Sequence, residues 1–112
     1  MGQPSVTPEA RYAALVETFL NEAGVAQEEG KGFGSAALKV RNRIFAMLVR
    51  GRLVVKLPRQ RVEALAAAGE GERYDPRHDG RLMKEWLVVA PSQEEQWPTL
   101  AREALAFVAA QG

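Results

Sequence analysis

Residues 37–57 constrain the fold most strongly, because their apolar side chains recur at every second position, as in β-strands. Three runs of this kind, ALKV, RIFAMLV and RLVVKL, are separated by the two-residue stretches Arg41-Asn42 and Arg50-Gly51. Asn and Gly tolerate the positive φ that a two-residue hairpin turn needs. The sequence therefore predicts three consecutive antiparallel strands joined by two tight turns.

A helical pattern precedes these strands. Thr7-Pro8-Glu9 is typical of a helix start, with a hydroxyl at the N-cap, a proline at the first position and an acid in the first turn. We expect the helix to stop at Gly24. Between these points the apolar side chains recur at helical spacing: Tyr12, Leu15, Val16, Phe19, Leu20 and Ala23.

The segment after residue 57 combines one short helix with two strands. Pro58 opens the helix, and Gly69 closes it. Its apolar positions are Val62, Leu65 and Ala66. The stretches GERYDP and MKEWLVVA then read as two strands, the second of which ends at Pro91.

The C-terminal segment predicts another helix. Ser92 and Glu95 have capping-box spacing, but Pro98 would remove a hydrogen bond deep inside a helix. We therefore expect a first turn at 92–96 and the main helix from about Trp97. Its apolar stripe comprises Trp97, Leu100, Ala101, Ala104, Leu105 and Val108. Trp86, on the preceding strand, and Trp97 are both expected in the core. The predicted order is α-β-β-β-α-β-β-α, a two-layer α+β domain with an antiparallel sheet.

The composition is that of a globular protein, with 112 residues of which 46% are hydrophobic and 26% charged. This length suits a single domain over residues 1–112, with residues 1–6 as a flexible tail. No apolar run reaches the ~18 residues of a membrane helix, and the N-terminus lacks the pattern of a secretory signal. The absence of cysteine excludes disulfides and thiolate chemistry. We expect a cytoplasmic protein without a membrane partner.

Positive charge is concentrated in residues 31–62, which hold nine Lys or Arg and none of the fourteen acids, although the net charge of the whole chain is only +1. A two-residue turn at Arg50-Gly51 divides the hairpin into two faces. The face predicted to join the core is wholly apolar: Ile44, Ala46, Leu48, Leu53, Val55 and Leu57. The other face is the candidate binding surface, with apolar residues rimmed by cations: Arg43, Phe45, Met47, Val49, Arg52, Val54 and Lys56.

Three interpretations of the candidate binding surface remain open. In the first, the arginines keep the sheet soluble and blunt its edges, while the apolar residues lie under a loop or in a homodimer. In the second, an apolar patch with a polar rim binds a dedicated protein partner. In the third, the basic hairpin binds nucleic acid by phosphate contacts and stacking. Against the third, the pI of about 8.1 is low for such a domain.

Motifs that would carry catalysis or ligand binding are weak. GKGFGS lacks the spacing of a phosphate-binding loop, and we assign its glycines to a tight turn. Asp75, His78 and Asp79 fall in turn-forming dipeptides, and Arg77 and Arg81 would repel a cation. No nucleophile–base pair or pair of carboxylates is evident. We therefore expect neither an enzyme nor a cofactor, a metal site or a small-molecule ligand.

Several segments occur together in a recognisable order: the turn Gly32-Phe33-Gly34, the strands IFAML and LVVKLP, then RYDP and MKEWLVV. Over roughly residues 8–110 the chain resembles the TfoX (Sxy) N-terminal domain family, which is close to the MmcQ/YjbR-like proteins. The resemblance implies an α-β3-α-β2-α fold and a link to regulators of competence gene expression. It supplies no catalytic residues.

The sequence thus favours a non-catalytic regulatory or protein-interaction module of the TfoX N-terminal type. We expect a protein partner or self-association. The alternative is direct DNA or RNA binding through the basic hairpin 39–61.

Overall fold

The computed structural model describes residues 7–27, 37–74 and 83–111. Three predictions fall outside these ranges and are not addressed by it: the flexible tail at 1–6, the Gly-Phe-Gly turn at 32–34, and the turn that carries Asp75, His78 and Asp79.

The described residues form three α-helices: α1 (Pro8–Phe19), α2 (Arg59–Ala67) and α3 (Trp97–Ala110). Helix α1 begins as predicted, because the hydroxyl oxygen of Thr7 accepts a hydrogen bond from the backbone N–H of Ala10 at 3.0 Å. It ends earlier than predicted. Leu20 is the C-cap and is 42% exposed, Ala23 is exposed, and Gly24 adopts a positive φ of 81° beyond the helix. The apolar stripe therefore stops at Phe19.

Six strands within the described residues form one antiparallel sheet in the order β1-β2-β3-β4-β6-β5. They are β1 (Val25–Gln27), β2 (Leu38–Val40), β3 (Arg43–Val49), β4 (Arg52–Lys56), β5 (Gly71–Tyr74) and β6 (Met83–Val89). All five predicted strands are present. The sequence did not predict β1, because three residues are too few to show a period of two. This edge strand is held by its pairing with β2.

Both predicted two-residue turns are present. Arg41 and Asn42 have φ of 54° and 67°, and Arg50 and Gly51 have φ of 52° and 80°. Positive φ at both central residues is the signature of a type I′ turn, whose twist matches that of the strands it joins. Next to the turn, the register of β3 against β4 is the predicted one, with Val49 opposite Arg52 and Met47 opposite Val54.

The first turn predicted at 92–96 is present before α3, but it starts one residue earlier. Residues Pro91–Gln96 form a 3-10 helix, η1, whose N-cap is Ala90. Proline suits the first helical position, so the chain turns into this helix one residue before Ser92. The predicted capping box at Ser92 is therefore wrong. The main helix α3 begins at Trp97, as predicted.

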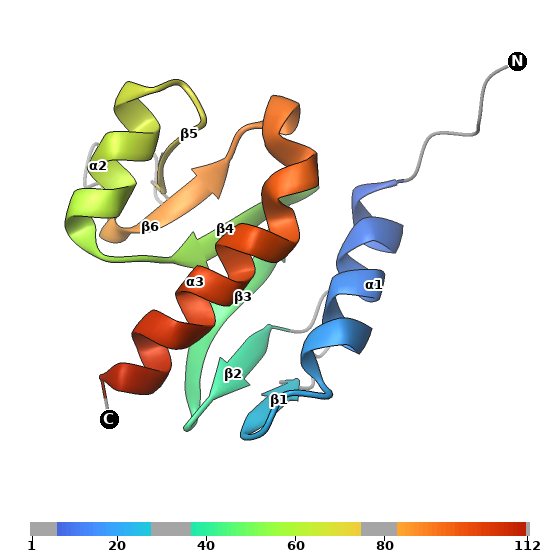
Figure 1. Ribbon diagram of the computed structural model, residues 1–112. Helices are drawn as coiled ribbons and strands as arrows, with labels where there is room; N and C mark the ends of the chain where they lie inside the picture. The colour runs from blue at the N-terminus through green and yellow to red at the C-terminus, as the bar shows by residue number, and fades with distance from the viewer. Residues whose placement is uncertain (1–6, 28–36, 75–82, 112) are drawn as a thin grey trace, which may run out of the picture.

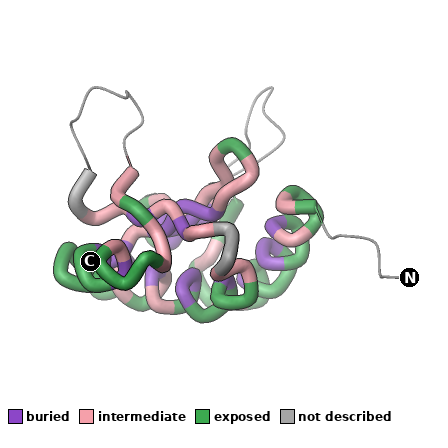
Figure 2. The backbone as a smooth tube through the Cα atoms, turned by 90° about the horizontal axis from the view of Figure 1, so that it is seen from above, coloured by how far each residue is buried: buried purple, intermediate pink, exposed green. Residues whose placement is uncertain are grey.

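The helices lie together on one face of the sheet and give the domain two layers (Figure 1). A single hydrophobic cluster, the helix-side core, joins them to the strands. Its fully buried members include Phe19 from α1, Val62 from α2, Val108 from α3, Val55 from β4 and Leu87 from β6. Figure 2 shows the buried stretches at the middle of the molecule and exposed stretches on the outer sides of the helices. The protein is thus an α+β domain with a six-stranded antiparallel sheet.

Candidate functional site

The candidate binding surface lies mainly on the face of the sheet opposite the described helices, called here the helix-free face. The turn between β3 and β4 pairs Met47 with Val54 and Val49 with Arg52. Directly paired residues in antiparallel strands point to the same side. Since Val55 belongs to the helix-side core, these four neighbours lie on the other face, as predicted.

Phe45 does not belong to the helix-free face, because β3 contains a bulge. The pairing of β3 with β2 shifts by one residue between Leu38 and Lys39. An extra residue in one strand locally disturbs the alternation of side chains. Phe45 is fully buried in the helix-side core, and its ring centroid lies 6.1 Å from that of Phe19. The placement of Phe45 on the candidate binding surface was therefore wrong.

The bulge also places the two residues that precede Phe45 on the faces opposite to those predicted. Ile44, predicted in the core, pairs with Lys39 and so shares the helix-free face, where it is partly exposed. Arg43, predicted on the candidate surface, pairs with Val40 of the helix-side core and lies exposed on that side. A shift of one residue moves side chains to the opposite face. Both errors have this one cause.

Strand β6 completes the helix-free face beside β4. Val88 pairs with Val54, and Trp86 pairs with Lys56, whose Nζ lies 5.9 Å from the centre of the indole ring. Trp86 is partly exposed, so its expected place in the core was wrong. Val54 is fully buried, so its assignment to the candidate binding surface was also wrong. We call the partly exposed apolar residues of this face the apolar patch: Ile44, Met47, Val49, Trp86 and Val88.

Carboxylates from outside the basic segment pair with several of its cations. Arg52 on the helix-free face donates to Glu72 of β5 at 3.2 Å. Arg61 of α2 donates through Nε and Nη2 to both oxygens of Glu103 in α3, each at 3.0 Å, and this hydrogen bonding raises the pKa of Arg61. Arg59 pairs within α2 at 3.3 Å. These ion pairs thus neutralise part of the positive charge that the sequence concentrates in residues 31–62.

Uncompensated charge gathers at the turn between β2 and β3. Lys39, Arg41 and Arg43 form no ion pair with any residue in the described ranges. Arg41 and Arg43 are exposed, and Lys39 is partly exposed. This turn is therefore the most cationic part of the described hairpin.

Among the residues at 7–27, 37–74 and 83–111 there is no group of three or more His, Cys, Asp or Glu that could hold a metal ion. The buried residues in these ranges are hydrophobic. Burial raises the pKa of the Tyr12 phenol above its ordinary value.

Comparisons with protein-family models, with curated proteins and with solved structures each found no match to this chain. In the part of the chain that the structure describes, no helix is long and apolar enough to cross a membrane.

Proposed function

We propose that this chain is a non-catalytic interaction module, of the kind the TfoX N-terminal domain resemblance implies, and that it self-associates through the apolar patch. One observation carries the proposal. Strands β3 and β6, on either side of β4, place partly exposed apolar side chains on a face that the described helices leave uncovered. A contiguous apolar surface with a polar rim is typical of a protein interface.

The charges beside the apolar patch suit a second copy of the chain. Arg52 and Glu72 put both signs of charge on the same face, from β4 and β5. A two-fold dimer needs a self-complementary surface, in which each residue meets its partner's counterpart. Two such faces can exchange the Arg52–Glu72 pair between copies while Met47 and Trp86 pack at the centre. Exposed ion pairs contribute little energy, so the apolar centre would carry the affinity.

Direct DNA or RNA binding is the second candidate, and the cations at the turn between β2 and β3 favour it. Affinity for a nucleic acid grows with the number of phosphates that the protein neutralises. Arg52 and Arg61 already have carboxylate partners, which a phosphate would have to displace. We rank self-association first for this reason.

Sedimentation velocity over a range of protein concentrations tests the dimer. We expect the wild type to dimerise and Met47→Asp to remain monomeric, because an unpaired charge is costly in an apolar interface. Leu20→Asp is the matched control, since Leu20 is a 42% exposed apolar residue at the end of α1, outside the apolar patch. Circular dichroism melting checks that both variants fold. A wild type that stays monomeric at every concentration would refute self-association.

Fluorescence anisotropy with duplex and single-stranded DNA tests the second candidate. Binding through the turn predicts that log K falls by about 0.9 per log unit of salt for each duplex phosphate neutralised. Charge reversal at Lys39, Arg41 and Arg43 should then abolish binding, whereas Met47→Ala, which changes no charge, should leave it unchanged. A monomeric wild type with this salt dependence would establish the second candidate in place of the first.

A further inference from the structure

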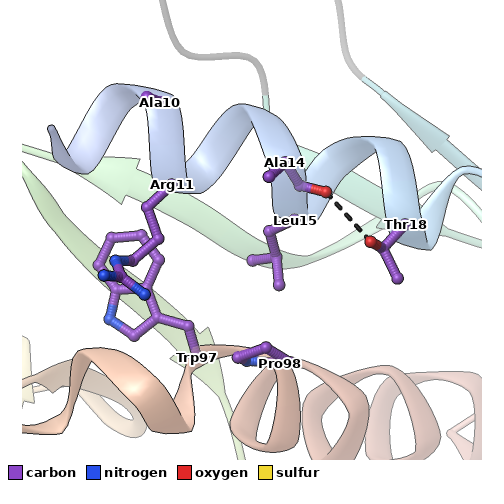
Figure 3. A pocket seen from close by; sticks show the side chains of 7 residues that line it. All are labelled: Ala10, Arg11, Ala14, Leu15, Thr18, Trp97 and Pro98. Carbon is purple, nitrogen blue, oxygen red and sulfur yellow. Dashed lines mark hydrogen bonds between the residues drawn. The ribbon is translucent and has the colours of Figure 1, made fainter. Parts of the chain in front are cut away.

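A pocket of about 280 Å³ lies between α1 and the start of α3, on the helix side of the sheet (Figure 3). Its walls are mostly apolar, with Ala10, Ala14 and Leu15 from α1 and with Trp97 and Pro98 from α3. The small side chains of the two alanines leave the space between the helices. An apolar cavity of about 150 Å³ can hold benzene, so this pocket has room for a small organic molecule.

Two buried N–H donors belong to residues that line this pocket. The Nε of Arg11 and the Nε1 of Trp97 are buried and have no acceptor within hydrogen-bonding distance among the described residues. Trp97 is only 2% exposed. The guanidinium of Arg11 lies over the indole ring, with Cζ 5.9 Å from the ring centre, so both donors occur at the same end of the pocket (Figure 3). A buried donor without an acceptor is unfavourable, so a ligand that supplied an acceptor to each donor would relieve this cost.

The polar side chain at the other end of the pocket already has a hydrogen-bond partner. The Thr18 hydroxyl donates to the carbonyl oxygen of Ala14 at 3.1 Å, so its proton is already used (Figure 3). The pocket therefore suits a molecule with an acceptor at one end and an apolar body.

The charge of Arg11 favours a carboxylate as the acceptor. Its nearest acidic neighbour is Glu94, whose Oε1 lies 3.7 Å from Nη2 and is beyond ordinary hydrogen-bond distance. A carboxylate has two oxygens, one for each donor, and its hydrogen bond to a guanidinium is charge-assisted.

We propose that this pocket binds a small carboxylic acid with an apolar body. In its ionised form the carboxylate accepts hydrogen bonds from Nε of Arg11 and Nε1 of Trp97, while the apolar body lies against Ala10 and Ala14. The site goes beyond the proposed dimer, because it lies on the opposite side of the sheet from the apolar patch. The sequence, in which no ligand-binding motif is evident, predicted no small-molecule ligand. The pocket is built from α1 and α3, which stand at opposite ends of the chain.

The experiment titrates phenylacetate and phenylacetamide into the full chain and follows the indole N–H resonances by NMR. Trp86→Phe distinguishes the two tryptophans. Phenylacetate should shift the Trp97 resonance in a saturable way, and the neutral amide should bind at least about tenfold more weakly, because it lacks the charge-assisted hydrogen bond. Trp97→Phe, which keeps an aromatic ring but removes the N–H, should also weaken phenylacetate about tenfold or more.

Leucine substitutions supply a matched pair of variants. Ala14→Leu fills the pocket and should abolish binding of phenylacetate, whereas Ala13→Leu, at the exposed neighbouring position, should not change it. Glu94→Gln should strengthen binding, because it removes a negative charge near Arg11 that repels the negative carboxylate of the ligand. Met47→Asp should bind phenylacetate like the wild type, so failure of the proposed dimer and failure of this site give distinguishable results.

Three outcomes would overturn the proposal. The first is the lack of a saturable shift at Trp97 with phenylacetate, and the second is equal binding of the acid and the amide. The third is unchanged binding in Ala14→Leu or in Trp97→Phe.

Discussion

Replacing Phe45 with alanine should destabilise the fold by about 3–5 kcal/mol, the usual cost of this change in a core. The side chain is fully buried, and its ring lies 6.1 Å from that of Phe19 with the two planes 59° apart. A tilted aromatic pair at this separation contributes about 0.5–1.5 kcal/mol beyond burial, which places the cost toward the upper part of the range. Domains have a total stability of only about 5–15 kcal/mol, so the loss is a large fraction of it.

Urea unfolding followed by far-ultraviolet circular dichroism measures this loss. With a slope of about 2 kcal/mol per M, a loss of about 4 kcal/mol lowers the midpoint by about 2 M. Met47→Ala is the comparison, because Met47 is close to Phe45 in β3 but lies partly exposed on the helix-free face. Its expected cost in the monomer is about 1 kcal/mol. Both variants should be measured at a concentration where the chain is monomeric, since dimerisation adds to apparent stability.

The two variants together test the bulge in β3. If strict alternation held through this strand, Phe45 would lie on the helix-free face beside Met47, and the two alanine variants would unfold at similar urea concentrations. A midpoint shift for Phe45→Ala no larger than that for Met47→Ala would therefore refute the bulge and the packing of Phe45 against Phe19.

Three further predictions concern stability. In Gly71→Ala the new Cβ would lie 2.6 Å from the backbone oxygen of Val88, so β5 must shift at a cost of about 2 kcal/mol or more. In Gly69→Ala the new Cβ would meet no atom within 4 Å, and the positive φ of 80° should cost about 1 kcal/mol. Thermal melts in which Gly69→Ala is the more destabilised variant would contradict the packing of β5. Thr7→Ala removes the N-cap hydrogen bond of α1 and should cost about 1 kcal/mol in urea unfolding, and an unchanged midpoint would argue against the cap. Because burial raises the pKa of Tyr12, the unfolded chain releases this proton above about pH 10 while the folded chain retains it. The stability is therefore complete below about pH 10 and falls as the pH rises above it, and Tyr12→Phe should flatten that fall; an identical pH profile in the variant would contradict the burial of the phenol.

The sequence by itself determined the elements whose signals lie within a few neighbouring residues. Asn42 and Gly51 accept positive φ at their turns, and this local property places β2, β3 and β4 in an antiparallel row. Thr7 starts α1 by a hydrogen bond within the first turn. The two-residue turn also fixes the register next to it, so Met47 and Val49 were assigned to the correct face.

Only the tertiary structure decided the features that depend on contacts between distant segments. The bulge at Phe45 depends on the pairing of β3 with β2 and on the contact of Phe45 with Phe19. The alternation of residues within β3 does not predict either contact. Trp86 reaches the helix-free face because β6 pairs with β4, after the chain has passed through α2 and β5. The pocket of Arg11 and Trp97 likewise requires α1 and α3 to pack side by side. Such pairings are chosen by the burial of the whole core, a property of the assembled domain that no short stretch of sequence contains.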